Sequence, residues 1–203
     1  MIVFLDCGAH CGESILRAKA QFGKNIKIVS FEPIPYFAKE IDRIWEGDES
    51  VDIVNAAVWI RDGLDTFQVS TKITDGSSLI EEHGKGWQDE ELAIEVNTVD
   101  FSKFLKQFKD KDFKLIVKFD IEGAEYQVLN KMINDETIGY VDEFWGEWHV
   151  PLTKEQEKCK TIIFEYFNKH NIQFKEWEQH IPTVGKAHPM LVERPKFLKD
   201  ILC

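Results

Sequence analysis

Side chains that could carry out chemistry are densest in the stretch Asp120-Ile-Glu-Gly-Ala-Glu125. It begins at the last residue of the mostly apolar run Lys114–Asp120, which predicts a buried core strand. Carboxylates at the end of such a strand lie at the carboxyl edge of the sheet, where doubly wound folds bind their ligands. Lys118 precedes Asp120 by two positions, so a regular strand would point both side chains to one side. These groups could hold an acceptor and take its proton, or simply cap a helix and form a structural ion pair.

A second reactive stretch is Glu147-Trp-His149, at the end of the strand expected over Val141–His149. Period-two alternation puts Glu147 and His149 on one face of that strand. An imidazole can accept a proton near neutral pH, and a neighbouring glutamate can fix its tautomer. Because this strand follows the one that ends at Asp120, we predict a shared site, although such a histidine can also be purely structural. The candidate catalytic residues are therefore Asp120, Glu122, Glu147 and His149.

The first residues of the chain predict a different kind of site. The apolar run Ile2–Leu5 indicates a buried strand, Gly8 and Gly12 a turn, and Glu13–Phe22 a helix. This order brings backbone N–H groups and a helix N-terminus to one point, which suits an anionic or nucleotide-like ligand. The spacing Asp-x-Gly-x-x-x-Gly is not that of the dinucleotide motif, and it lacks the lysine of a phosphate loop.

Glu32 is an acidic residue at the position where nucleotide-binding folds commonly have one. Glu32 ends the second predicted strand, Ile26–Phe31, and lies 20 residues after Gly12. In a doubly wound sheet, an acid at this place accepts hydrogen bonds from the two ribose hydroxyls. We therefore interpret Glu32 as a ribose-binding residue rather than an exposed loop glutamate.

The elements that must position these residues alternate along the chain. Helices are expected over 36–45, 101–108, 124–133 and 153–170, and further strands over 51–59, 66–70, 94–99, 172–177 and 189–193. Strands alternating with helices, followed by paired strands, predict an α/β fold with a doubly wound, mostly parallel sheet and an antiparallel edge. Without repeats or a plausible linker, residues 1–203 are expected to form one domain.

Composition narrows the classes of partner. The net charge of −11 disfavours nucleic acid, since the lysines of Lys103–Lys111 are interleaved with acids on an expected solvated face. A neutral small molecule or glycan fits this charge better. No apolar run is long enough for a membrane span, and no signal-peptide pattern is present. The four cysteines lack zinc-site spacing, so we expect reduced thiols and a cytoplasmic protein.

Taken together, the motifs resemble those of FkbM-type S-adenosylmethionine-dependent methyltransferases. The resemblance covers roughly residues 2–150, and the string from Lys118 to Glu125 is its most specific part. The matching motifs, in chain order, are Asp6-x-Gly-Ala-x-x-Gly12, Phe31-Glu-Pro33, Asn55-Ala-Ala57, Thr98-Val-Asp100, Lys118-Phe-Asp-Ile-Glu-Gly-Ala-Glu125 and Glu147-x-His149. The family is similar to other Rossmann-like methyltransferases, which implies a seven-stranded sheet with an antiparallel last strand.

The resemblance also implies roles for individual residues. The Gly8–Gly12 turn would hold the methionine portion of S-adenosylmethionine, and Glu32 its ribose. The region of Asn55 would border the adenine. The residues expected at the cofactor, which leaves as S-adenosylhomocysteine, are Asp6, Gly8, Ala9, His10, Gly12, Ser14, Glu32, Pro33, Asn55, Ala56 and Asp120. The family commonly has Asn at the position of His10 and an aliphatic residue at that of Cys11, so this turn departs from the usual pattern.

Family members typically methylate hydroxyls of sugars or polyketide-type products, so we expect O-methylation of a sugar or glycan, for example a deoxyhexose such as rhamnose or fucose. In-line methyl transfer needs alignment and a base for the hydroxyl proton. We expect Asp120 or His149 to be that base and Glu122 and Glu147 to orient the acceptor or the base.

Three alternatives stay open. A divalent cation held by Asp120, Glu122, Glu147 and His149 could activate the acceptor, which would make the protein a metal-dependent methyltransferase of small natural products; we do not favour it. Lys118 and Asp120 are similar to the lysine–aspartate pair of RNA ribose 2′-O-methyltransferases, which the acidic charge opposes. The chain could also be a nucleotide-binding module without catalysis. The sequence identifies neither the acceptor nor the oligomeric state.

Overall fold

A computed structural model describes residues 1–70, 76–81, 91–150 and 152–177. A six-stranded sheet forms its centre, in the order β3-β2-β1-β7-β8-β9, and every neighbouring pair is parallel. The strands are β1 (Ile2–Cys7), β2 (Ile26–Phe31), β3 (Val51–Val54), β7 (Lys114–Phe119), β8 (Glu143–Gly146) and β9 (Phe174–Glu176). The expected α/β, mostly parallel sheet is confirmed.

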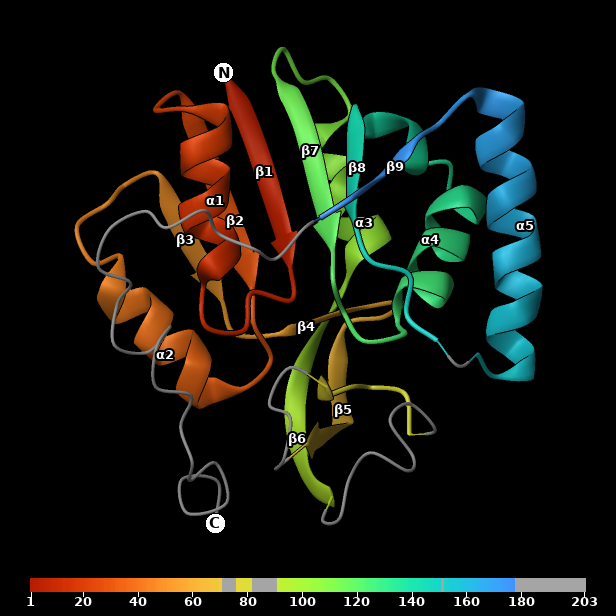
Figure 1. The fold of residues 1–203 in the computed structure, drawn as a ribbon, viewed down its shortest axis with the longest axis horizontal. Helices are drawn as coiled ribbons and strands as arrows, with labels where there is room; N and C mark the ends of the chain where they lie inside the picture. The colour runs from red at the N-terminus through yellow and green to blue at the C-terminus, as the bar shows by residue number, and fades with distance from the viewer. Residues whose placement is uncertain (71–75, 82–90, 151, 178–203) are drawn as a thin grey trace.

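Helices cover both faces of this sheet (Figure 1). One face packs against α1 (Glu13–Phe22) and α2 (Pro35–Ile44), and the other against α3 (Phe101–Leu105), α4 (Glu125–Asn134) and α5 (Lys154–His170). Short 3₁₀ turns follow α3 and α4, at Lys106–Phe108 and Ile138–Tyr140. Among the described residues, no helix is long and apolar enough to cross a membrane.

The strands alternate between two apolar cores, as strand geometry requires. In β1, Val3 and Leu5 join the core beneath α3, α4 and α5, whereas Phe4 joins the core beneath α1 and α2. In β7, Ile116 lies in the α1 core, so Lys118, two positions later, points to that same side. The register pairs Asp6 of β1 with Lys118 of β7. Sheet alternation therefore puts two charged groups side by side, under α1.

A smaller sheet lies beyond the carboxyl ends of β1 and β7 (Figure 1). It contains β4 (Ala57–Trp59), β6 (Glu91–Asp100) and β5 (Gly63–Ser70) in the order β4-β6-β5, with β5 antiparallel to β6. The single strand predicted over 51–59 is wrong in one respect. It ends at Val54, and after Asn55 and Ala56 the chain leaves the main sheet and joins β6.

The C-terminal strands differ in part from the expectation. The strand predicted over 172–177 is β9, which pairs in parallel with β8. The strand expected over 189–193, and with it the antiparallel seventh strand, lies outside the described residues.

The order of the main sheet reverses between β1 and β7: the chain runs from β1 to β2 and β3 on one side, and from β7 to β8 and β9 on the other. The carboxyl ends of β1 and β7 therefore form the switch point at which such sheets bind ligands.

Candidate active site

A cleft of about 330 Å³ opens at this switch point. Its walls come from the carboxyl ends of β1, β2 and β7, from α1, from Phe67 of the smaller sheet, and from Ser77 in the segment 76–81. Eight of the sequence-predicted site residues line it, namely Gly8, Ala9, His10, Ser14, Glu32, Pro33, Asp120 and Glu122. Residues that we expected at the methyl donor therefore share one cavity with Asp120 and Glu122, two of the four that we expected at the acceptor.

In the glycine turn, two residues have a left-handed backbone conformation, which only glycine adopts without strain. Gly8 has φ +87° and Gly12 has φ +84°. A Cβ on Gly8 would lie 1.8 Å from the carbonyl oxygen of Asp120, so the turn approaches β7 as closely as backbone allows. His10, between the glycines, also has a positive φ of 47°. Asparagine, aspartate and histidine occur at positive φ more often than other residues with a side chain, so His10 can take this conformation.

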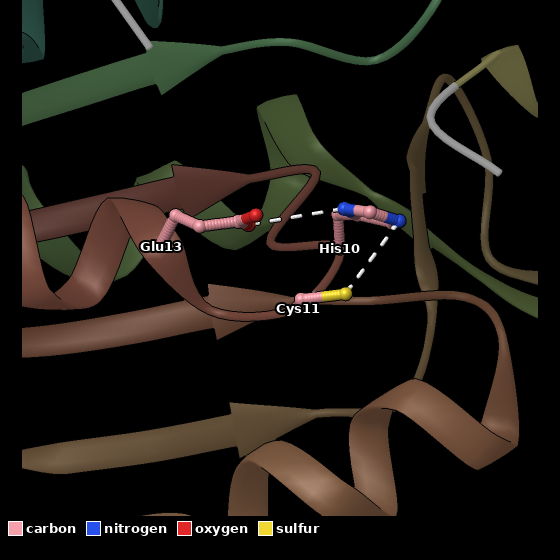
Figure 2. Close-up of side chains that lie close together, drawn as sticks. All are labelled: His10, Cys11 and Glu13. Carbon is pink, nitrogen blue, oxygen red and sulfur yellow. Dashed lines mark hydrogen bonds and ion pairs between the residues drawn. The ribbon is translucent and has the colours of Figure 1, made fainter. Parts of the chain in front are cut away.

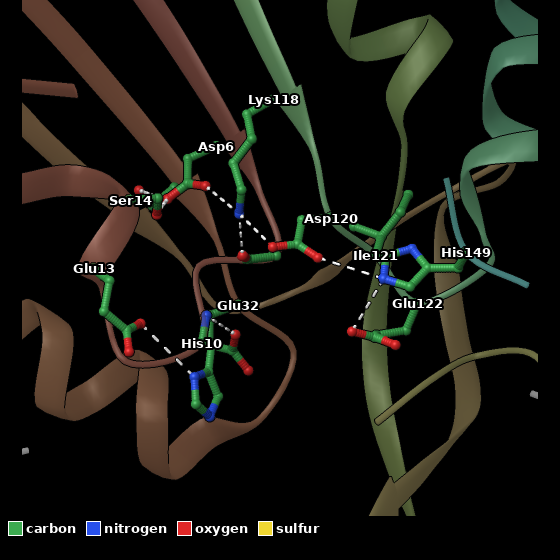
Figure 3. Close-up of polar contacts among 12 residues, drawn as sticks. Asp6, His10, Glu13, Ser14, Glu32, Lys118, Asp120, Ile121, Glu122 and His149 are labelled. Carbon is green, nitrogen blue, oxygen red and sulfur yellow. Dashed lines mark hydrogen bonds and ion pairs between the residues drawn. The ribbon is translucent and has the colours of Figure 1, made fainter. Parts of the chain in front are cut away.

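Beneath the turn, the buried Lys118 ammonium joins the strands (Figure 3). Its Nζ lies 3.2 Å from Asp6 Oδ1 and 3.2 Å from Asp120 Oδ2, and it donates a hydrogen bond of 2.8 Å to the Gly8 carbonyl. Burial alone would lower the pKa of Lys118, but the two carboxylates raise it above its ordinary value. Ser14 and Ser30 donate to the other oxygen of Asp6. Asp6 thus supports the turn from below.

Glu32 lies at the end of β2 with both carboxylate oxygens held by backbone. Oε2 accepts from the N–H of His10 and Oε1 from that of Ile34, each at 2.8 Å. The side chain is only 4% exposed. Burial raises the pKa of Glu32 to about 7, although the two backbone donors oppose the shift. Each oxygen keeps further acceptor capacity toward the cleft that Glu32 lines.

His10 faces two polar neighbours (Figure 2). Its Nε2 lies 3.7 Å from the Cys11 thiol, and its Nδ1 lies 3.8 Å from a carboxylate oxygen of Glu13. Burial alone would lower the pKa of His10, but contacts with Cys11 and Glu13 raise it to about 10. His10 is therefore a cation paired with Glu13 at neutral pH. Among the described residues, Cys7, Cys11 and Cys159 are free thiols.

Beyond Asp120, His149 lies among three carboxylates, of which Figure 3 labels those of Asp120 and Glu122. Its Nε2 is 3.3 Å from Glu122 Oε1 and 3.6 Å from Asp120 Oδ1, and its Nδ1 is 2.8 Å from Glu125 Oε1. Burial would lower the pKa of His149, but the bonds to Glu122 and Glu125 raise it to about 11. His149 is therefore an imidazolium ion in this arrangement and has no free lone pair with which to accept a proton.

The partner that orients His149 is Glu125, whereas the sequence pointed to Glu147. Glu125 is fully buried, and it also accepts the backbone N–H groups of Ile121 and Gly123, each at 2.9 Å. It therefore shapes the loop that carries Glu122, whose φ is +52°. Glu147 follows the end of β8, and burial together with the charge of Asp120 raises its pKa.

A comparison with family models decides the class of protein. The model of the methyltransferase FkbM domain matches residues 6–185 of the 203 in the chain. The chain belongs to the FkbM methyltransferase family. No curated protein and no solved structure matches it significantly. The match contains the glycine turn, Glu32, the Asp120–Glu125 loop and His149, so the cleft is the expected place for methyl-transfer chemistry in this FkbM domain.

Six predicted residues do not line the cleft: Asp6, Gly12, Asn55, Ala56, Glu147 and His149. Asp6 lies behind the turn, and the side-chain amide of Asn55 donates to the carbonyls of Glu32 and Pro33, at 2.9 and 3.0 Å. Asn55 thus holds the loop that presents Glu32. Sequence reasoning did not assign Glu13, Arg17 or Trp177 to the site, yet all three line it, as does Lys118, which it considered only beside Asp120. For Arg17 and Trp177 no motif gave a signal.

Among the described residues of the FkbM domain, two groups of side chains have donors of the kinds that bind metals. In each, one ligand atom per residue lies within 4.8 Å of the others, in the sets His10, Cys11, Glu13 and Asp120, Glu122, His149. The second set fits a divalent cation by type, with Glu125 fixing the imidazole as metal sites commonly require. The same distances fit a protonated His149 that is ion-paired with the carboxylates, and this reading needs no cation.

Proposed function

We propose that the protein is an S-adenosylmethionine-dependent O-methyltransferase that acts on a hydroxyl of a sugar or glycan. The observation that carries the proposal is the meeting of two kinds of residue in one cleft. Gly8 and Glu32 supply a nucleotide-type half, and Asp120 and Glu122 supply a carboxylate half. The family generally uses S-adenosylmethionine, and the residues of the first half suit that ligand.

The fit to the cofactor rests on backbone and charge. The positive φ of Gly8 and the carboxylate of Glu32 are the features that a ribosyl ligand needs at the ends of neighbouring parallel strands. The acidic residues of the cleft also suit a cation. S-adenosylmethionine would supply a methyl group on a positively charged sulfur. The chain's own task is then to hold the acceptor hydroxyl in line with that group and to remove its proton.

Asp120 is the base that the geometry favours. It lines the cleft, and its backbone N–H donates to the Cys7 carbonyl at 3.1 Å, which fixes its place next to the glycine turn. Its two oxygens face Lys118 and His149. A protonated His149 cannot accept the proton, so we assign it to positioning Asp120 and Glu122. Both cations hold the Asp120 carboxylate in place beside the glycine turn.

The acceptor is inferred from the charge and the donor types around Asp120. Carboxylates such as Glu122, with Glu147 nearby, accept hydrogen bonds from several hydroxyls at once, as a sugar ring requires. The net charge of −11 opposes a polyanionic acceptor such as RNA.

The test is transfer of a labelled methyl group from S-adenosylmethionine to a panel of rhamnosides and fucosides, with a phenol, a peptide and an RNA oligonucleotide as competing classes. We expect label on a deoxyhexoside, strong loss in Asp120→Asn, and normal activity in the exposed control Asp110→Asn. Label on a phenol or peptide alone would refute the sugar acceptor, and binding without transfer to any acceptor would favour a binding module.

A second candidate is metal-dependent O-methylation of a small natural product. It is favoured by one observation, the convergence of Asp120, Glu122 and His149 within 4.8 Å. These residues would hold a cation that lowers the pKa of the acceptor hydroxyl. Activity that survives EDTA would exclude it, whereas loss on chelation with recovery on adding Mg²⁺ would replace the general-base assignment.

A further inference from the structure

Arg17 of α1 lines the cleft, and one of its guanidinium nitrogens is buried without a hydrogen-bond acceptor in the described part of the chain. Its Nη1 is inaccessible to solvent and has no hydrogen-bond partner among the described residues. A buried charged donor without a partner is costly, so such a group needs an acceptor, which an ordered water or a ligand in the cleft can supply. Arg17 has no role in the contacts that shape the glycine turn.

The position of Arg17 is fixed by an aromatic ring rather than by an acid. Its guanidinium lies 4.4 Å from the centroid of Trp177, a nearly fully buried residue of the α1 core. Glu13 is one helical turn earlier, at the spacing that suits an ion pair, but it contacts His10 instead. Stacking leaves the edge of a guanidinium free, and this edge donates in the fork geometry that matches a carboxylate.

The other cations of the cleft already have acids beside them. Lys118 lies between Asp6 and Asp120, and His10 lies against Glu13. Within the described part of the cleft lining, Arg17 is the cation without such an acid. A ligand that complements this pattern has positive charge near Asp120 and one carboxylate near Arg17.

The sheet order gives the direction in which such a ligand would lie. Glu32 ends β2, on one side of β1. Trp177 follows β9 and donates its backbone N–H to Gly146 at the end of β8, on the other side. A ribose at Glu32 therefore leaves the rest of the molecule to cross β1 toward Arg17.

We propose that Arg17, stacked on Trp177, binds the amino-acid carboxylate of the methyl donor. The inference rests on the proposed function, because it assumes S-adenosylmethionine as the donor. It assigns Arg17 to donor affinity and specificity and gives it no part in removing the acceptor proton.

Binding calorimetry with two nucleosides tests this assignment. S-adenosylhomocysteine carries the carboxylate, and S-adenosyl-3-thiopropylamine lacks only that group. Arg17→Gln should weaken binding of S-adenosylhomocysteine about 10- to 100-fold, as expected for a charge-assisted hydrogen-bonded pair. The same substitution should change binding of the propylamine analogue by less than about threefold, and Arg17→Lys should fall between wild type and Arg17→Gln for S-adenosylhomocysteine.

The control is Arg43→Gln, an arginine on α2 paired with Glu40, which should bind both nucleosides like wild type. Equal weakening of both nucleosides in Arg17→Gln, or no weakening of either, would overturn the proposal while leaving the donor itself established. Failure of the wild-type protein to bind S-adenosylhomocysteine would instead remove the proposed function, and this inference with it. Thermal unfolding of each variant identifies any loss of fold.

Discussion

Glu32 should make the folded protein less stable as the pH rises, whereas most acidic side chains have the opposite effect on stability. Its pKa rises from 4.5 to about 7 because burial disfavours the charged carboxylate more than the N–H groups of His10 and Ile34 favour it. The folded state therefore holds a proton that the unfolded chain releases at lower pH. As pH rises from about 4.5 to about 7, this proton is lost and the folded state is destabilised.

The size of the effect follows from the two pKa values. Each pKa unit corresponds to about 1.4 kcal/mol, so the whole interval amounts to about 3 kcal/mol. Most of this falls between about pH 5 and about pH 8. Because the side chain is only 4% exposed, solvent screening reduces this figure little. We expect Glu32 alone to make the free energy of unfolding about 2–3 kcal/mol lower at pH 8 than at pH 5.

Urea denaturation of wild type and Glu32→Gln at both pH values measures this contribution. Glutamine does not titrate, so the unfolding free energy of Glu32→Gln lacks the pH dependence that this site gives the wild type. The fall in unfolding free energy with pH should therefore be smaller in Glu32→Gln by about 2–3 kcal/mol. The exposed control Glu46→Gln should follow wild type. Equal pH dependence in Glu32→Gln and wild type would refute the buried, proton-binding carboxyl.

The same proton links Glu32 to the cofactor. Ribose hydroxyls donate to an ionised carboxylate, so binding lowers the pKa of Glu32 and releases a proton when the pH is below about 7. S-adenosylhomocysteine should therefore bind more tightly as pH rises through 7. Calorimetry in buffers of different ionisation enthalpy reports the released proton, and its absence at about pH 6 would argue against contact between Glu32 and the ribose.

Three other substitutions test the framework of the site. Gly8→Ala should abolish cofactor binding or unfold the protein, because the new Cβ would lie 1.8 Å from a backbone oxygen. The control is Gly23→Ala, which has a similar φ of +80° but open space around it. A denaturant titration should show that Gly23→Ala lowers the free energy of unfolding by about 1 kcal/mol. Lys118→Met should destabilise the protein by about 3–5 kcal/mol, since it leaves two carboxylates uncompensated; a loss below 1 kcal/mol would contradict the buried ion pairs. The imidazole of His149 should remain protonated at about pH 8 in NMR spectra and should titrate at lower pH in Glu125→Gln; a neutral wild-type ring would restore it as a candidate base.

The contacts that strand alternation controls could be predicted from the sequence. Lys118 and Asp120 are two residues apart after an apolar run, and they do share a side, where they contact each other. Glu32 directly follows β2 and borders the cleft, as its expected place at the carboxyl edge of the sheet predicted. Both acids come directly after a core strand, and the order of strands in a doubly wound sheet places such residues at the switch point without knowledge of distant contacts.

Contacts made across helices and turns could not be predicted in this way. Glu147 has the alternation that suits a partner for His149, but β8 ends at Gly146, so the alternation does not extend to either residue. Glu125 reaches His149 because α4 packs beside the end of the sheet, which is a tertiary arrangement. The break after Val54 has the same origin, because the Asn55 amide binds the Glu32 and Pro33 carbonyls and stops the ladder.

Lys118 explains why the two halves of the cleft belong to one site. Its ammonium contacts Asp6 and the Gly8 carbonyl on the donor side and Asp120 on the acceptor side. The bonds come from adjacent parallel strands, whose spacing of about 4.8 Å is small enough for one side chain to bridge. A displacement of the turn proposed to hold the methyl donor would therefore disturb the proposed base as well. In-line transfer would depend on that relative position, so in the proposed reaction the buried lysine fixes the geometry of the two halves.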